Sequence, residues 1–204
     1  MAILERELSG RRDDTIVVDR RYRLTTEQYY RMGEAGVFGD DKRIELIDGE
    51  VVKLEPIGPM HSRRGQRLYR SLLDALRNAE FFVVYEEPIT VIDGTEPQPD
   101  LAVAIGPESK YDDIHPRVED LALVVEVSAS SLASDRKRKL GLYASAGIPE
   151  FWIVNLPDKQ VEVYTDPADS TYMQTTIYKA GDELPLRFAP GNSLSVADFL
   201  PNSK

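Results

Sequence analysis

The chain has 204 residues, of which 42% are hydrophobic and 29% charged, as in an ordinary globular domain rather than a disordered or membrane protein. It contains no cysteine, which excludes disulfides, zinc–thiolate sites and cysteine nucleophiles. The formal net charge of −10 argues against a general nucleic-acid coat protein, but it is compatible with a local basic groove or with an acidic cluster that holds a cation.

The N-terminal segment differs in composition from the rest of the chain. Residues 1–20 are polar and rich in Arg and Asp, which predicts an N-terminal arm followed by a single domain over residues 21–204. The segment lacks the apolar stretch of a signal peptide, and no apolar run approaches the roughly 20 residues of a membrane span. We therefore expect a cytoplasmic protein with no membrane partner.

Two local signals follow the arm. Thr25 and Gln28 have the spacing of a capping box, and Gly36 is suited to end a helix, so a short helix is expected between them. Further on, Asp48-Gly49 separates two short β-type runs. This dipeptide is the strongest local signal for a β-hairpin.

The central region predicts alternating helices and strands. A helix over residues 60–79 is indicated by an apolar stripe of leucines at positions 68, 72, 73 and 76. The remaining expected elements are strands over 81–91, 100–105, 121–128, 150–155 and 159–165, a helix over 131–147 that stops at Gly147, one or two further strands, and a short turn over 195–200. This order predicts an α/β domain with a mixed central sheet flanked by helices.

Glu126 lies in the middle of the strand predicted over 121–128, where its neighbours are apolar. A carboxylate buried without a partner costs several kcal/mol or becomes protonated. Asp100 opens the preceding predicted strand, so two carboxylates converge if these strands are neighbours. Such a pair, with no histidine or cysteine beside it, makes an all-oxygen site suited to Mg²⁺ or Mn²⁺, and the cation would neutralise Glu126.

Lys139 lies on the next predicted helix, beside its inner face and one turn before Tyr143. A lysine there can bury its stem and bring its ammonium group to the end of the sheet. Two carboxylates, a cation and a lysine can together activate water and stabilise negative charge. This is the chemistry that hydrolyses a phosphodiester. Tyr143 is expected to pack rather than to react.

Four segments carry a family resemblance: "RIELIDGEVV", "PQPDLAV", "LALVVEVSASSLASDRKRKLGLYASAGIPEFWIVN" and "QVEVY". They resemble the Uma2 (formerly DUF820) family of restriction-endonuclease-like proteins, in the PD-(D/E)XK nuclease superfamily. The similarity covers about residues 22–165. It implies the restriction-endonuclease-like fold and a metal-dependent hydrolysis of nucleic acid, most often DNA.

The resemblance also implies site residues. Asp100 would be the aspartate of the PD element and Glu126 the second acidic residue, while Ser128 stands where the plain motif has lysine. Members of the family typically carry that lysine on the following helix, which matches Lys139. Glu45 matches an upstream acidic residue that serves as an extra metal or water ligand, and His61 matches a histidine common at the start of the second helix.

Other readings remain open for individual residues. Glu126 could form a structural ion pair with Arg136 or Arg138. The predicted second helix carries a basic stripe that could bind phosphates or could simply be a solvated face; it contains Arg63, Arg64, Arg67 and Arg70. His61 could contact the substrate, support a ligand of the metal, or cap the helix.

The sequence as a whole predicts a Mg²⁺- or Mn²⁺-dependent endonuclease that acts on nucleic acid, with DNA as the expected substrate. Its catalytic residues would be Glu45, Asp100, Glu126 and Lys139, and its candidate substrate contacts are His61, Arg63, Arg64 and Arg67. The alternative is a catalytically inactive nuclease fold that binds nucleic acid or a protein. A homodimer is expected because many such nucleases cut two strands as pairs. Glycine-rich phosphate loops, HExxH and a serine-hydrolase elbow are absent from the sequence.

Overall fold

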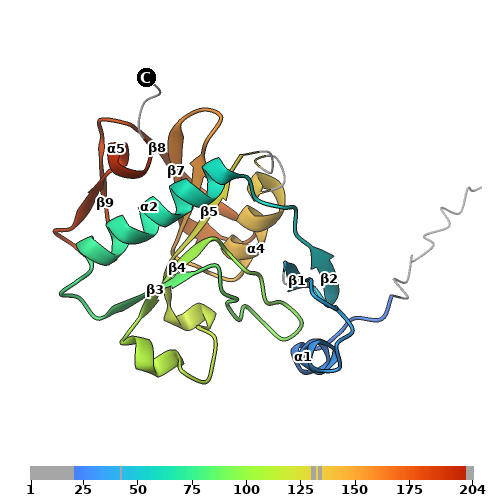
Figure 1. Ribbon diagram of the computed structural model, residues 1–204. Coiled ribbons are helices and arrows are strands. Elements are labelled where there is room, and N and C mark those ends of the chain that lie inside the picture. The colour runs from blue at the N-terminus through green and yellow to red at the C-terminus, as the bar shows by residue number, and fades with distance from the viewer. Residues whose placement is uncertain (1–20, 42, 130–131, 133–134, 201–204) are drawn as a thin grey trace, which may run out of the picture.

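The computed structural model describes residues 21–41, 43–129, 132 and 135–200 and is built around a six-stranded mixed sheet (Figure 1). In spatial order the strands are β3 (Phe81–Tyr85), β4 (Leu101–Ile105), β5 (Leu121–Ser128), β6 (Glu150–Asn155), β7 (Gln160–Ala168) and β8 (Thr171–Lys179). Strands β5 and β6 are parallel, whereas the other neighbours are antiparallel. The predicted fold class is confirmed, and the predicted arm over residues 1–20 lies outside the described residues.

Helices cover both faces of this sheet (Figure 1). On one face, α2 (Pro59–Ala75) packs its buried Leu68 and Leu72 against the strands, together with α5 (Val196–Phe199). On the other face lies α4 (Leu140–Ser145), which contributes Tyr143 to a second apolar cluster. The two clusters use alternate residues of each strand, as the period of two requires.

The leucine stripe of α2 is narrower than the sequence predicts. Leu68, Leu72 and Leu76 are buried, but the side chain of Leu73 is 42% exposed. One residue along a helix is a rotation of about 100°, which turns Leu73 away from the sheet. The helix also ends at Ala75, several residues before the predicted end.

The segment before α2 forms a helix and a hairpin beside the sheet (Figure 1). Helix α1 (Thr26–Glu34) begins with the predicted capping box, in which the Thr25 side chain accepts from the Gln28 N–H. The hairpin pairs β1 (Ile44–Ile47) with β2 (Glu50–Lys53). Its turn has φ of 52° at Asp48 and 70° at Gly49, as expected for an Asp-Gly hairpin.

The C-terminal part of the chain contains more strands than the one or two predicted after β7. Besides β8, a small antiparallel pair is formed by β9 (Glu183–Pro185) and β10 (Ser193–Ser195). Short 3₁₀ turns, η1 (Glu108–Tyr111) and η2 (Val118–Asp120), occupy the connection before β5.

The helix predicted over 131–147 departs from regular α-helix in its first half. Residues 130, 131, 133 and 134 are not described, and the next turn, η3 (Asp135–Lys139), is a π-helix that continues directly into α4. Gly147, with φ of 77°, ends the helical segment as predicted. No helix in the described part of the chain is long and apolar enough to span a membrane.

Adjacent leucines of α2 provide a test of this packing. Leu72→Ala should lower the free energy of unfolding by about 2–5 kcal/mol because it leaves a cavity under the helix. Leu73→Ala, on the exposed face, should change it by about 0.5 kcal/mol or less. Urea denaturation of both variants measures the difference, and equal losses would contradict the orientation of α2.

Candidate metal and catalytic site

Asp100 and Glu126 lie side by side on neighbouring strands. Leu101 of β4 is paired with Val125 of β5, so the next step of this antiparallel register brings Asp100 beside Glu126. The Oδ2 atom of Asp100 accepts a hydrogen bond from the Val127 N–H at 2.6 Å, which ties the start of β4 to β5. The two carboxylates were expected to converge if their strands are neighbours, and β4 and β5 are neighbours.

Lys139 reaches Glu126 from the face of the sheet that α4 covers. Its Nζ lies 2.5 Å from Glu45 Oε1 and 3.3 Å from Glu126 Oε1. The three side chains are largely buried, with exposed fractions of 14% for Lys139, 3% for Glu45 and 9% for Glu126. Burial lowers the pKa of Lys139, but the charges of Glu126 and Glu45 outweigh burial and leave the pKa above its ordinary value. The ammonium group is therefore charged at neutral pH.

Tyr143 also contacts this cluster, one turn after Lys139. As expected, its ring packs in the core, with its centroid 5.1 Å from that of Phe151. Its hydroxyl, in addition, donates a hydrogen bond to Glu126 Oε1 at 2.8 Å, a contact that sequence reasoning missed. Burial, followed by the charges of Glu126 and Glu45, raises the pKa of Tyr143 well above its ordinary value. The hydroxyl is thus a permanent donor that orients Glu126.

His61, in the first turn of α2, contacts Asp100. The His61 Nε2 atom lies 3.1 Å from Asp100 Oδ2, and because a carboxylate only accepts, this nitrogen carries the hydrogen. Burial lowers the pKa of His61, but the hydrogen bond to Asp100 and its charge outweigh burial, so the pKa is raised overall. The structure therefore brings His61 together with Asp100.

The other predicted substrate contacts lie further along α2. Arg63 and Arg67 are exposed, and Arg64 is half-buried. Within the described residues, none of the three forms an ion pair with a carboxylate. These arginines remain available to an external anion.

The backbone around Asp100 holds Glu45 in position. The Gln98 N–H donates to Glu45 Oε1 at 2.8 Å, and the Gln98 side chain donates to the carbonyl oxygen of Glu86. Gln98 is a supporting residue that sequence reasoning missed. Its place between two prolines, in a loop that leads directly into Asp100, was the available signal.

The alternative ion pair proposed for Glu126 is not formed with Arg136. Arg136 instead pairs with Glu162 of β7, and its Nε donates to Glu162 Oε2 at 2.9 Å. Asn155 and Tyr164 donate to the same carboxylate at 2.7 Å each. Burial opposes the charged form of Glu162, but these bonds outweigh it and lower its pKa to about 2. Arg136 thereby fixes the π-helix three residues before Lys139.

The donors of this site suit a hard divalent cation. Asp100 and Glu126 supply carboxylate oxygens from adjacent strands, and Asp100 Oδ1 accepts no hydrogen bond from any described residue. Within the described ranges, no three His, Asp or Glu side chains form a preassembled metal site. The Lys139 ammonium instead provides the positive charge between Glu45 and Glu126.

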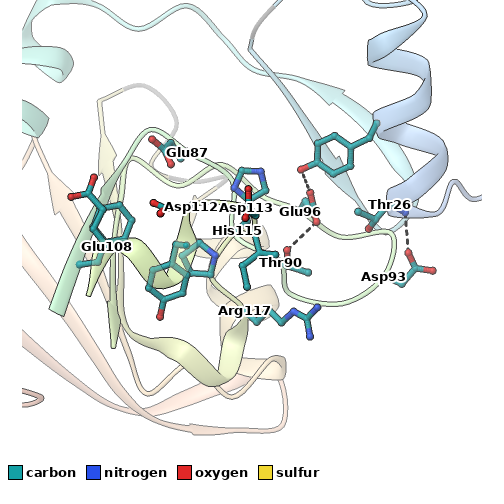
Figure 2. Close-up of a pocket in the computed structure, with 15 residues that line it drawn as sticks. Thr26, Glu87, Thr90, Asp93, Glu96, Glu108, Asp112, Asp113, His115 and Arg117 are labelled. Carbon is teal, nitrogen blue, oxygen red and sulfur yellow. Dashed lines mark hydrogen bonds between the residues drawn. The ribbon is translucent and has the colours of Figure 1, made fainter. Parts of the chain in front are cut away.

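A hollow of about 810 Å³ lies apart from these residues, and the side chains that line it are drawn in Figure 2. It contains none of the four predicted catalytic residues. Its carboxylates outnumber its basic groups, Arg117 and His115; they are Glu87, Asp93, Glu96, Glu108, Asp112 and Asp113. The Glu96 carboxylate already accepts hydrogen bonds from the hydroxyls of Tyr30 and Thr90. An excess of carboxylates repels phosphate, so this hollow does not suit a nucleic acid.

Comparison with known proteins identifies the class of fold. A solved structure described as "a putative nuclease belonging to DUF820", from Anabaena variabilis ATCC 29413, superposes with a TM-score of 0.66 at 14% sequence identity. The match covers 87% of this chain and 97% of that chain. The molecule thus has the fold of that described nuclease.

Comparison of the sequence with models of protein families identifies the family. Residues 26–197 match the model described as "Uma2: Putative restriction endonuclease". The chain belongs to the Uma2 family, as the motifs indicated, and this membership supports a nuclease-like function. No curated protein matches the chain.

The Glu162 cluster predicts a pH dependence of stability. Its folded pKa of about 2 is below the ordinary value of 4.5, so its contribution is full above pH 4.5 and is lost as the pH falls towards 2. The shift corresponds to roughly 3 kcal/mol. Urea denaturation across this pH range should therefore show a steeper loss of stability in the wild type than in Glu162→Gln. Parallel pH profiles would contradict the assignment.

Proposed function

We propose that the protein is a metal-dependent endonuclease that hydrolyses phosphodiester bonds of DNA. The observation that carries this proposal is the convergence of Asp100, Glu126 and Lys139. They come from three separate segments, yet they meet at one largely buried point. Membership of the Uma2 family supports the same reaction class.

In this proposal Asp100 and Glu126 hold Mg²⁺ or Mn²⁺, with Glu45 as a further ligand, directly or through water. The bound ion would lower the pKa of a coordinated water and stabilise charge on the phosphoryl oxygens. Val127 N–H and His61 fix the Asp100 carboxylate, while Tyr143 fixes Glu126. These contacts reduce the reorganisation needed when substrate binds.

Lys139 supplies the second function of the proposed site. Its charged ammonium can donate to the attacking water, orient it and offset the negative charge that develops on the phosphate. Because its pKa is raised, the group is a donor and a point charge rather than a general base. Along α2, Arg63, Arg64 and Arg67 would contact backbone phosphates without reading sequence.

A second candidate function is a nuclease fold that binds nucleic acid without cutting it. One observation favours it: Lys139 already neutralises Glu45 and Glu126, so the described arrangement is electrostatically complete without an ion. The two functions differ in whether a divalent cation binds and whether the phosphodiester is broken.

Cleavage of supercoiled plasmid and of single-stranded DNA, with Mg²⁺ or Mn²⁺, tests the proposal. Asp100→Asn should abolish both cleavage and Mn²⁺ binding measured by calorimetry, because it removes a negatively charged ligand. Lys139→Ala should retain Mn²⁺ binding but cut at least about a hundredfold more slowly, as for loss of one transition-state donor.

Arg77→Gln is the matched control, since Arg77 is exposed and, among the described residues, pairs with Asp74 alone. It should behave like the wild type. Cleavage that persists in Asp100→Asn and Lys139→Ala would refute this site. Oligonucleotide binding by the wild type, with no cleavage in either metal, would establish the binding function instead.

We also propose, as part of this function, a homodimer in the cytoplasm. Strand β8 supports the dimer: it is nine residues long, is outermost in the six-stranded sheet, and pairs with no strand of the described chain other than β7. Its Met173 and Ile177 side chains are 69% and 43% exposed. An open edge strand of this kind can pair with a second copy.

Light scattering coupled to size-exclusion chromatography should give twice the chain mass of 23.0 kDa. Met173→Lys should shift the protein towards the monomer, because a lysine on an edge strand opposes pairing. Val37→Lys changes an equally prominent exposed residue outside the sheet and should leave the mass unchanged. A monomeric wild type would refute the dimer.

A further inference from the structure

Arg43 lies beside the carboxylate site, immediately before β1. The Leu54 N–H donates to the Arg43 carbonyl at 2.8 Å, which continues the β1–β2 ladder one pair beyond Ile44 and Lys53. Arg43 therefore has extended backbone, and its side chain points to the same face as that of Glu45, two residues on. Because Glu45 points to Lys139, that face is the one turned towards the site.

The guanidinium of Arg43 has no partner within the described chain. No carboxylate of the described residues lies within ion-pair distance, and the Nε atom is shielded from solvent without a described acceptor. A buried donor left unpaired costs about 1–3 kcal/mol. The exposed Arg63 and Arg67 carry no such cost because water solvates them. The position of Arg43 thus requires an explanation that theirs do not.

A second unpaired buried atom belongs to His61. The Nδ1 atom of His61 is also buried without a hydrogen-bond partner, while its Nε2 faces Asp100. The positive charge of Arg43 acts to lower the pKa of His61, which places the two side chains within electrostatic range of each other. The site carboxylates already have their cations, since Lys139 faces Glu45 and Glu126, and His61 faces Asp100. The charge of Glu86 also acts on the pKa of His61, in the raising direction, but within the described residues neither Glu86 nor any other carboxylate forms an ion pair with Arg43.

The first turn of α2 contributes to the same electrostatic environment. This 17-residue helix begins at Pro59, its N-cap Gly58 has no side chain to cap it, and its first turn contains no acidic residue. The uncapped N–H groups and the helix dipole favour an anion at this end. His61 belongs to this turn, and Arg43 is within electrostatic range of His61, so all three favour an anion at this end of the helix.

We propose that Arg43, together with His61 and the first turn of α2, binds a phosphate group of the nucleic-acid backbone beside the metal-holding carboxylates. The inference rests on the proposed function, because it names the substrate group that this part of the site holds. A guanidinium matches phosphate oxygens through two parallel hydrogen bonds, which a lysine cannot reproduce.

Nuclear magnetic resonance of ¹⁵N-labelled protein tests binding without any need for cleavage. The Arg43 Nε–Hε signal, assigned by its absence in Arg43→Lys, should shift when inorganic phosphate is added at constant ionic strength. The corresponding signal of Arg77, which is exposed, should not shift. An Arg43 signal that phosphate leaves unmoved would overturn the inference.

The salt dependence of oligonucleotide binding gives a second readout, measured with Ca²⁺ to prevent turnover. Arg43→Gln should weaken binding of a single-stranded oligonucleotide about tenfold and reduce the slope of log K against log salt by about 0.7, as for loss of one phosphate contact. Arg43→Lys should keep the slope but lose part of the affinity. Arg77→Gln should change neither, and thermal unfolding confirms that each variant is folded.

Failure of the inference and failure of the proposed function are distinguishable. If the wild type cuts DNA and Arg43→Gln binds it with unchanged affinity and salt slope, the phosphate site is wrong and the nuclease stands. If the wild type never cuts but the Arg43 signal and salt slope respond as expected, the phosphate site stands and the catalytic proposal is wrong.

Discussion

The buried ammonium group of Lys139 is the interaction on which the arrangement of the site depends. It lies between Glu45, on a hairpin outside the main sheet, and Glu126, inside the sheet. Two largely buried carboxylates repel each other, and the ammonium group between them offsets that repulsion. One lysine therefore joins the hairpin, the sheet and the helix at a single point.

The surrounding contacts restrict where that lysine can be. Arg136, three residues earlier, forms an ion pair with Glu162. The Glu162 carboxylate also accepts hydrogen bonds from Asn155 and Tyr164. The intervening turn is a π-helix. This geometry is rare in proteins, and where it occurs it is often at a functional site. Two charged residues on one turn are thus anchored to two different strands, which fixes both the rotation and the height of the helix over the sheet.

Patterns with a short range in the sequence predicted most of this fold. The capping box at Thr25, the Asp48-Gly49 turn and the apolar run around Glu126 each specify local geometry, and the structure has all three. The adjacency of Asp100 and Glu126 was expected on the condition that their two strands are neighbours, and β4 and β5 are neighbours in the structure. The helical spacing placed Lys139 beside the inner face of its predicted helix, and the family motifs then singled it out as the lysine of the site.

Other features could not be predicted because they depend on tertiary geometry. The exposure of Leu73 depends on how α2 is rotated over the sheet, and the hydroxyl contact of Tyr143 depends on how far α4 sits from β5. Arg43 shows no signal of its own, since only the hairpin register reveals the face to which it points. That Arg43 has no ion-pair partner among the described residues can be recognised only from the positions of the charged side chains in the folded chain.

The single parallel pair of the sheet, β5 and β6, has a consequence for Ser128. Antiparallel neighbours can be joined by a tight turn, but a parallel pair requires a crossover that returns over one face of the sheet. That crossover leaves β5 just beyond Glu126 and passes over the face that carries it. A basic residue can therefore reach the strand end from the connection as well as from the strand. The topology therefore allows a serine at position 128, because a lysine on the crossover helix can bring the positive charge to the same end of the strand.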